Sequence, residues 1–442
     1  MFKGFFGGLQ KAGFRARLSV RLDRPGIGVS SLSLRGVLRA GVLLCLGLSL
    51  AGCGGKDAQR EADKGAPHEL SKGARHAAAD YAPSAEFPLP AGLEDNVEFW
   101  RKVYTEWGRD KVVIHDDRYL GIVYQVASLP GPIEAVYTPA QKAYAESLED
   151  SWRARLAALS SRTASGARLT PAEQELKAKL ERGGGSGALF GAAERVRSQR
   201  GVRERYRDGL ARSGRWEPVF REVFRRHGLP EDLALLPHVE SSFQANARSS
   251  AGASGMWQFV RATGKNYMTV DSAIDERLDP VMAADAAARY LKSAYAKLRS
   301  WPLALTSYNH GVGGMLRAKE RYGTDMTRIV RDYDGRYFGF ASRNFYAQFL
   351  AARHVARNAD RYFPEGVRFE APLSDQPVRL SYAVWVDDLA RHYRVPPSAL
   401  ITRNLSWLEP VRRGEHPVPA GTTVWLPQGA SRLARGQPRP SM

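Results

Sequence analysis

Apolar residues recur every three to four positions between Trp216 and Phe363, and glycine or proline separates the runs. Such spacing places apolar side chains on one face of successive helices. Strand-like alternation is scarce in this part of the chain. The pattern therefore predicts an α-helical domain over residues 216–365.

The preceding region, residues 91–215, is also predicted to be mainly helical. Long charged stretches over 140–159 and 171–182 have the composition of exposed helices. The glycine-rich segment 183–187 separates them from a further helical run. The segment 112–124 is compatible with two short strands or with an extended turn.

A different pattern begins after Phe363. It comprises a strand-like alternation, two helical runs and a second alternation, over residues 378–382, 386–393, 397–403 and 422–426. This order predicts a small βααβ module over 376–428. The basic tail 429–442 contains proline, and we expect it to be disordered. The expected fold class of the whole chain is mainly α.

The first 52 residues have the pattern of a secretory signal, because basic side chains precede a short apolar run over 40–52. That run is too short to span a bilayer, which takes about 20 residues. It ends in Leu-Ala-Gly-Cys at 50–53, which resembles the lipobox of bacterial lipoproteins. The resemblance implies a lipoprotein signal peptide over 1–52, lipidation of Cys53 and the outer membrane as destination. An ordinary signal peptide with an incidental cysteine is the alternative.

Residues 53–90 are rich in Ala, Gly, Lys, Asp, Glu and Pro, with few aliphatic side chains. Such a segment cannot bury a core, so we expect a flexible tether between the lipid and the folded part. This arrangement predicts a lipid-anchored protein on the periplasmic side of the outer membrane.

Charge adds one constraint on partners. The chain carries 65 basic and 46 acidic side chains, a formal net charge of +19. A basic balance favours an anionic partner such as nucleic acid, a membrane surface or an acidic polymer. The export signal disfavours nucleic acid. Cys45 and Cys53 are the only cysteines, so the remaining residues hold no cysteine-based zinc site or disulfide framework.

Three segments carry the densest candidate chemistry. They are Glu240-Ser241 at the end of a predicted helix, Gly255-Met256-Trp257-Gln258 after a run of small residues, and Ser307-Tyr308-Asn309-His310-Gly311 at the end of another helix. Taken alone, each has a structural explanation. The second reads as a turn followed by core packing, and the third as a helix C-terminus capped by Asn and Gly.

Together, in this order and at these separations, the three segments resemble the lysozyme-like domain of lytic transglycosylases, of the membrane-bound murein transglycosylase D type. The pattern of that family is Glu-Ser, then Gly-Leu-Met-Gln, then Ala-Tyr-Asn-x-Gly. This chain departs from the pattern at Met256, Trp257 and Ser307. Phe345, followed by Tyr346, stands where a late tyrosine is usual.

The resemblance implies that Glu240 is the catalytic residue. It also implies a set of substrate-binding residues: Ser241, Gly255, Met256, Trp257, Gln258, Tyr308, Asn309, Phe345 and Tyr346. The chemistry of the side chains agrees, because breaking a glycosidic bond requires a carboxylic acid that stays protonated near neutral pH. Apolar neighbours such as Val239 and Phe243 are expected to raise the pKa of Glu240 by desolvation. The amides of Gln258 and Asn309 suit N-acetyl and hydroxyl groups, and Tyr308 offers a ring face.

The implied reaction is cleavage of the β-1,4 bond between N-acetylmuramic acid and N-acetylglucosamine in peptidoglycan glycan strands. Glu240 protonates the leaving oxygen and then takes a proton from the muramyl 6-hydroxyl, which closes a 1,6-anhydro ring. This chemistry requires no metal and no organic cofactor. The alternatives are a hydrolytic muramidase on the same fold and a non-catalytic wall-binding lipoprotein.

Two other groups of polar residues are candidates for chemistry. Asp275 and Glu276 are candidates for a second catalytic carboxylate, but we favour a salt-bridged loop in which Asp279 leads into the next helix. His115, with the two aspartates that follow it, suggests a metal ligand. No partner at metal-binding spacing supports this, so a turn is favoured.

The βααβ module resembles a LysM module, a unit that binds N-acetylglucosamine polymers. The residues that fit are Asp388-Leu389-Ala390, Tyr393, Val395, Asn404, Val418-Pro419-Ala420-Gly421 and Leu426-Pro427. The usual Gly-Asp before the first helix is replaced by Val384-Trp385, and Arg394 stands where glycine is usual. We expect the LysM fold, with sugar binding as its implied function.

Overall fold

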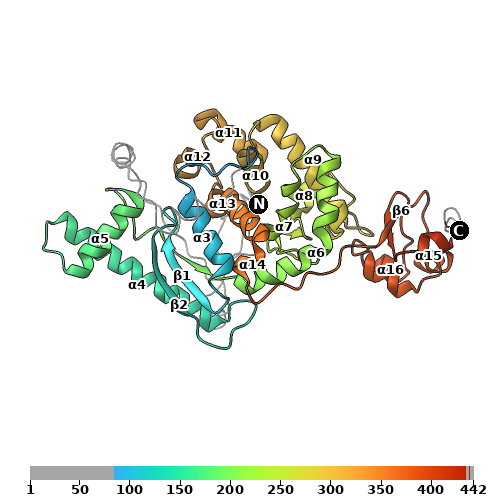
Figure 1. Cartoon of the computed structure of the whole chain (residues 1–442), viewed down its shortest axis with the longest axis horizontal. Coiled ribbons are helices and arrows are strands. Elements are labelled where there is room, and N and C mark those ends of the chain that lie inside the picture. Colours follow the sequence, from blue (N-terminus) through green and yellow to red (C-terminus); the bar gives the residue numbers. More distant parts are fainter. Residues whose placement is uncertain (1–83, 435–437, 439–442) are drawn as a thin grey trace, which may run out of the picture. The chain divides into compact units, whose positions relative to one another are not determined.

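The computed structural model describes residues 84–434 and residue 438 (Figure 1). The predicted signal peptide, Cys53 and most of the predicted tether lie outside these residues. Helices dominate the described part of the chain, which confirms the expected mainly α fold class.

The region before residue 216 combines helices with a small sheet. Its elements are α3 (Glu94–Thr105), β1 (Lys111–Asp116), β2 (Val123–Ser128), α4 (Pro139–Ala164), α5 (Pro171–Gly184), β3 (Val196–Arg200) and α6 (Arg203–Arg226). Helices α4 and α5 begin at Thr-Pro pairs. Thr138 and Thr170 each form a capping box with the third helical residue, which satisfies amides that a helix start leaves unpaired.

The sheet has the order β2-β1-β3 and is antiparallel throughout, with Ile114 opposite Gln125 on one side and Ser198 on the other. Of the two possibilities for segment 112–124, two strands is therefore the observed one. Strand β3 was not expected, because the pattern favoured a helix after 183–187. Its sequence, Val-Arg-Ser-Gln-Arg, has a single apolar residue and gains its strand conformation by pairing with β1.

The predicted helical domain comprises many short elements and two long helices. They are η1 (Glu231–Leu235), α7 (Pro237–Glu240), β4 (Ala253–Ser254), β5 (Phe259–Val260), α8 (Arg261–Gly264), η2 (Glu276–Leu278), α9 (Pro280–Leu298), α10 (Trp301–His310), α11 (Val312–Tyr322), α12 (Met326–Asp332), α13 (Phe340–Arg357) and α14 (Ala359–Tyr362). The two long helices are α9 with 19 residues and α13 with 18.

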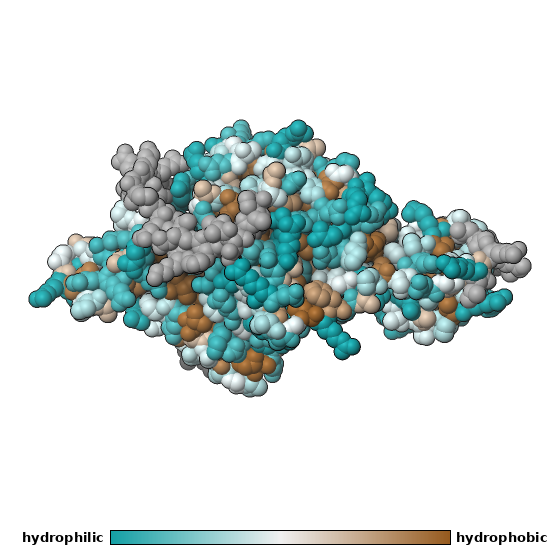
Figure 2. Space-filling model, viewed as in Figure 1, coloured by the Kyte–Doolittle hydropathy of each residue, from teal (hydrophilic) through white to brown (hydrophobic). Residues whose placement is uncertain are grey.

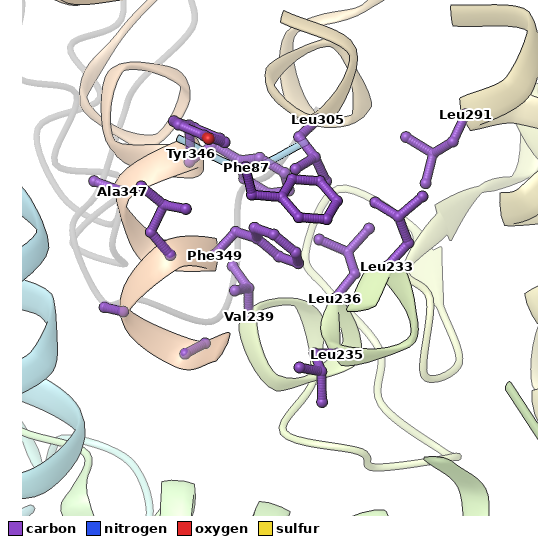
Figure 3. Packing of buried hydrophobic residues seen from close by; sticks show 14 of the residues in the cluster. Phe87, Leu233, Leu235, Leu236, Val239, Leu291, Leu305, Tyr346, Ala347 and Phe349 are labelled. Carbon is purple, nitrogen blue, oxygen red and sulfur yellow. The ribbon is translucent and has the colours of Figure 1, made fainter. Parts of the chain in front are cut away.

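One hydrophobic core joins this domain to part of the region before it. Helix α6 runs without interruption across the predicted boundary at 215/216. Side chains of α3, such as Trp100, belong to the same buried cluster as side chains of α13. Figure 3 shows part of this core, in which Leu233, Leu236 and Val239 face Phe349 of α13. A second, separate core lies between the sheet and helices α4 and α5.

The C-terminal module has its own core and the predicted β, α, α and β elements, with one further short helix, α17 (Glu409–Arg412), that was not predicted. The elements are β6 (Gln376–Arg379), α15 (Val386–Tyr393), α16 (Pro397–Arg403), α17 and β7 (Thr423–Leu426), with β6 antiparallel to β7. Ala273 and Ile274 of the helical domain complete its core. The short helix α18 (Ala430–Leu433) follows, where a disordered tail was expected.

Apolar side chains are largely withdrawn into these three cores. The face shown in Figure 2 is mostly hydrophilic, with small and separate hydrophobic patches. Among the described helices, none combines the length and apolar character that a membrane span requires.

Candidate active site

Glu240 is the last residue of α7, at the end of an apolar run that is anchored in the core. The preceding side chains of this run, Leu233, Leu236 and Val239, are buried against α13 (Figure 3). Since these anchors repeat at helical spacing, they fix the rotation of the segment and hence the position of its last side chain.

The Glu240 carboxyl is buried, and neither of its oxygens has a hydrogen-bond partner among the described residues. Burial raises its pKa well above the ordinary value, as predicted. A carboxyl that keeps its proton near neutral pH is suited to protonate a leaving oxygen. The structure therefore gives Glu240 the properties of a general acid.

The backbone reverses directly after Glu240 in an unusual conformation. Ser242 and Phe243 have positive φ angles of 53° and 57°. The amides of Ser241 and Phe243 both donate to the carbonyl of Pro237. Left-handed conformations cost about 1–2 kcal/mol for each residue that has a side chain. Such strain persists only where surrounding contacts hold it, and it is concentrated at functional sites.

The second motif is joined to the first by a hydrogen bond from Ser241 Oγ to the carbonyl of Met256, at 2.9 Å. Gly255 has a φ of 78°, and a Cβ there would lie 1.7 Å from the carbonyl oxygen of Arg277. Gln258 also has a positive φ, and its Nε2 donates to the carbonyls of Ala247 and Gly255. Its Oε1 is buried with no partner among the described residues, which leaves one acceptor available for a ligand.

Met256 and Trp257 do not present their side chains to a cleft. Both are buried, and the Trp257 ring packs against Phe220 and Phe224 of α6. Its Nε1 donates to the carbonyl of Pro280. The core-packing explanation therefore describes these two side chains better than sugar contact does.

Helix α10 brings the third motif to the same place. Tyr308 Oη donates to the carbonyl of Trp257 at 2.9 Å. Burial raises the pKa of Tyr308, and the nearby Glu240 carboxylate raises it further. Asn309 Oδ1 accepts a hydrogen bond of 2.7 Å from Ser342 Oγ of α13. Sequence reasoning missed Ser342, because nothing near Asn309 in the chain indicates which residue of a distant helix will face it.

Phe345 and Tyr346, the candidates for the late tyrosine, lie buried in α13. Tyr346 Oη donates to the carbonyl of Pro88 at 2.7 Å, and the ring lies near Phe87 (Figure 3). The hydroxyl of Tyr346 thus holds the segment that leads into α3.

The acidic loop 275–279 is structural, as favoured from the sequence. Arg277 forms a bidentate ion pair with Asp275 and also donates to the carbonyls of Gly252 and Phe259. Glu276 accepts from the amide of Thr269. Asp279 caps α9, and burial raises its pKa to about 6. Through Arg277 this loop supports the strands on either side of Gln258.

His115 and Asp116 are the last two residues of strand β1, so the favoured turn was wrong for them, and the chain bends only from Asp117. Asp116 accepts hydrogen bonds from the amides of Arg118 and Tyr119 and pairs with Arg195 at 2.9 Å. Within the described residues, no group of three His, Cys, Asp or Glu side chains is arranged to hold a metal ion.

The part of the chain that carries this geometry is similar to known proteins. Residues 219–330 match the transglycosylase SLT domain family. The chain is 30% identical over 155 residues to membrane-bound lytic murein transglycosylase D of Escherichia coli, which covers 34% of this chain and 32% of that protein. It is 33% identical over 115 residues to membrane-bound lytic murein transglycosylase F of Stutzerimonas stutzeri, covering 24% of this chain and 22% of that protein.

Two further similarities also cover only part of this chain. A putative tributyltin chloride resistance protein of an Alteromonas species is 34% identical over 113 residues, covering 24% of this chain and 54% of that protein. A solved lytic transglycosylase Slt from Pseudomonas aeruginosa aligns at 17% identity with a TM-score of 0.26, covering 33% of this chain and 24% of that one. The chain thus spans about a third of the length of the Escherichia coli relative. All three sequence motifs fall inside the matched segment, residues 219–330, whereas Phe345 and Tyr346 fall outside it.

Proposed function

We propose that this chain is a peptidoglycan lytic transglycosylase that cleaves the β-1,4 bond between N-acetylmuramic acid and N-acetylglucosamine without water. The observation that carries the proposal is the Glu240 carboxyl, buried without a hydrogen-bond partner among the described residues and with a raised pKa. The SLT domain match over the surrounding residues supports the choice of substrate.

The proposed reaction uses one carboxyl group twice. Glu240 gives its proton to the glycosidic oxygen as the bond from that oxygen to C1 of the muramic acid breaks. The resulting carboxylate takes the proton of the muramyl 6-hydroxyl, and O6 forms a new bond to C1. The products are a free 4-hydroxyl on N-acetylglucosamine and a 1,6-anhydro-muramic acid end, and Glu240 ends protonated as it began.

The substrate contacts that we propose follow from the polar atoms around Glu240. The buried Oε1 of Gln258 is available to accept from an N-acetyl N–H or a hydroxyl. Asn309 is held by Ser342 and lies one residue from Tyr308, whose pKa responds to Glu240. Ser241 and Gly255 contribute by shaping the backbone, and Phe345 and Tyr346 by packing beneath the site.

A hydrolytic muramidase is the second candidate, and it requires a water activated by another carboxylate about 5–9.5 Å across the cleft. We predict that no carboxylate occupies that position, since Asp275 and Glu276 are committed to the loop. The mass of the products separates the two reactions, because hydrolysis adds a water and the anhydro product lacks it.

The decisive experiment is digestion of purified sacculi followed by mass spectrometry of the released muropeptides. The intact chain should release anhydro-muropeptides, and Glu240→Gln should lower turnover by about 10⁴-fold or more while substrate binding survives. Glu231→Gln is the matched control, because Glu231 is an exposed carboxylate that pairs with Arg225 in the same segment. Hydrated products, or an active Glu240→Gln variant, would contradict the proposal.

We propose in addition that the C-terminal module is a LysM-like binder of glycan strands and that Cys53 carries the lipid of an outer-membrane lipoprotein. Two antiparallel strands that enclose the two predicted helices, with the short α17 added, support the first proposal. The Leu-Ala-Gly-Cys sequence supports the second. Cys53→Ser should abolish incorporation of a palmitate analogue without unfolding the helical domain, and undiminished labelling would contradict lipidation.

A further inference from the structure

The strained turn after Glu240 is held from one side by helix α6. Arg205, Gly209 and Arg212 lie at positions i, i+4 and i+7 of this helix and therefore share one face. Gly209 lets the helix approach closely, since a Cβ there would lie 3.1 Å from the Cβ of Ser242 and 3.2 Å from its carbonyl oxygen. The face of α6 is thus fitted to the turn.

Both arginines donate side-chain hydrogen bonds to this turn. Arg212 donates from Nε and Nη2 to the carbonyl of Ser242, at 3.0 and 2.8 Å. Arg205 donates to Ser242 Oγ at 3.2 Å and to the carbonyl of Ser241 at 3.4 Å. These bonds account for the two carbonyl groups that immediately follow Glu240.

Retaining two arginines here is electrostatically unfavourable. Burial lowers the pKa of Arg205 to about 10, and the charge of Arg212 lowers it further. Burial also lowers the pKa of Arg212. Asp208 and Glu370 offset part of this cost at Arg212, and the carbonyls of the turn add hydrogen bonds to both guanidinium groups.

We infer that Arg212 and Arg205 are positioning residues for the acid at Glu240. They hold the left-handed turn 241–243, and this turn ends helix α7 at Glu240 and sets where its carboxyl points. Both residues precede the matched segment 219–330, so the functional unit begins near residue 203. The inference rests on the proposed function for its kinetic consequence but not for its geometry.

The kinetic test uses soluble peptidoglycan fragments. Arg212→Gln should lower kcat by about 10- to 100-fold, as expected when a reacting group is misplaced by about 1 Å, with KM changed by less than about 2-fold. Arg212→Lys should recover part of kcat, because an ammonium group offers one of the two bonds. Gly209→Ala is a second variant, in which a better helix former crowds Ser242. It should lower kcat without lowering the thermal midpoint.

Arg207→Gln is the matched control, since Arg207 lies on the same helix and points to Glu365 instead. An unchanged kcat in both Arg212→Gln and Gly209→Ala would overturn the inference. A fall in kcat that only follows the unfolded fraction would also overturn it. A crystal structure of Arg212→Gln tests the inference without an activity measurement. If the Glu240 carboxyl kept its original position in this variant, Arg212 would not be a positioning residue. Absence of anhydro products from the unmodified chain would instead refute the proposed function.

Discussion

The two flanks of the matched segment 219–330 are joined to it in different ways. On the N-terminal side, α3 packs in the same core as α13, and α6 continues into the segment without a break. On the C-terminal side, the module has a separate core that includes only Ala273 and Ile274 from the helical domain. One flank is part of the catalytic body, and the other is attached to it.

The C-terminal module is attached through a few contacts, and its Trp425 also belongs to the shared core. The amide of Asp275 donates to the carbonyl of Ser406, and the amide of Leu408 donates to the carbonyl of Ala273. Trp425 Nε1 adds a hydrogen bond to Asp279 Oδ2 at 2.7 Å. All of these contacts converge on loop 273–279. The extent of the matched segment is therefore not the extent of the folding unit.

The difference between the two flanks is tested most strongly by removing one buried tryptophan from each of them. Trp100 is buried in the shared core and Trp407 in the core of the module. Each change to alanine should destabilise its own core by about 3–5 kcal/mol. Trp100→Ala should therefore abolish cleavage of soluble fragments, whereas Trp407→Ala should leave it intact. Thermal unfolding followed together with activity checks this, and equal loss of activity in both variants would contradict the distinction.

Truncation after Phe363 is expected to have the next largest effect. It removes the module, including Trp425, and uncovers Ile274, but the other buried residues of the shared core lie at or before Phe363 and are kept. Cleavage of soluble fragments should persist. Retention on insoluble sacculi should fall by up to about 100-fold, because a second binding site contributes through its effective concentration. Equal sedimentation of the full and truncated chains with sacculi would show that the module is not a wall binder.

The sequence predicted those parts of the fold that depend on local pattern. Helices 386–393 and 397–403 were predicted at their observed bounds, because their apolar spacing is regular and their partners are near in the chain. Strand β3 could not be predicted, since its conformation depends on pairing with β1 more than 80 residues earlier. The continuity of α6 across residue 216 was likewise hidden by Gly214 and Pro218, which favour a boundary in isolation.

The same division applies to the site. The burial and raised pKa of Glu240 were predictable from its apolar neighbours in the sequence. For Trp257 the sequence left core packing and sugar contact both open, because the motif alone does not indicate which side chain meets α6. The contacts of Arg205 and Arg212 with the turn join residues 30 to 37 positions apart in the sequence, and no sequence pattern marks them.

The stability of the folded chain should depend on pH through the buried carboxyl of Glu240. An unfolded chain has the ordinary Glu240 pKa near 4.5, whereas the folded chain has a raised one. Between these two values the folded state binds more protons, so its stability falls as pH rises. Glu240→Gln should therefore gain about 1.4 kcal/mol over the unmodified chain for each pH unit in this window. Chemical denaturation from pH 4.5 upward measures the difference.

That pH dependence should also be present in the chain truncated after Phe363, because the core residues that anchor α7, such as Leu236 and Val239, are kept. Activity should decline on the alkaline side, where the acid loses its proton. A constant difference in stability between Glu240→Gln and the unmodified chain at all pH values would mean that the carboxyl is not buried in its neutral form.

The smallest expected effect is local to the attachment of the module. Trp425→Phe keeps an aromatic ring but removes the donor to Asp279, which should weaken the junction by about 1.5 kcal/mol. The pKa of Asp279, about 6, is raised by burial and held down in part by this hydrogen bond. The pKa should therefore rise further in the variant. The amides of Asp275 and Leu408 donate across the junction to the carbonyls of Ser406 and Ala273, and their hydrogen exchange should accelerate about 10-fold. The amide of Leu291, deep in the shared core, is the internal control and should not change. Faster exchange at Leu291 as well would mean that the junction and the catalytic body open together, and the C-terminal flank would then belong to the same cooperative unit as the N-terminal one.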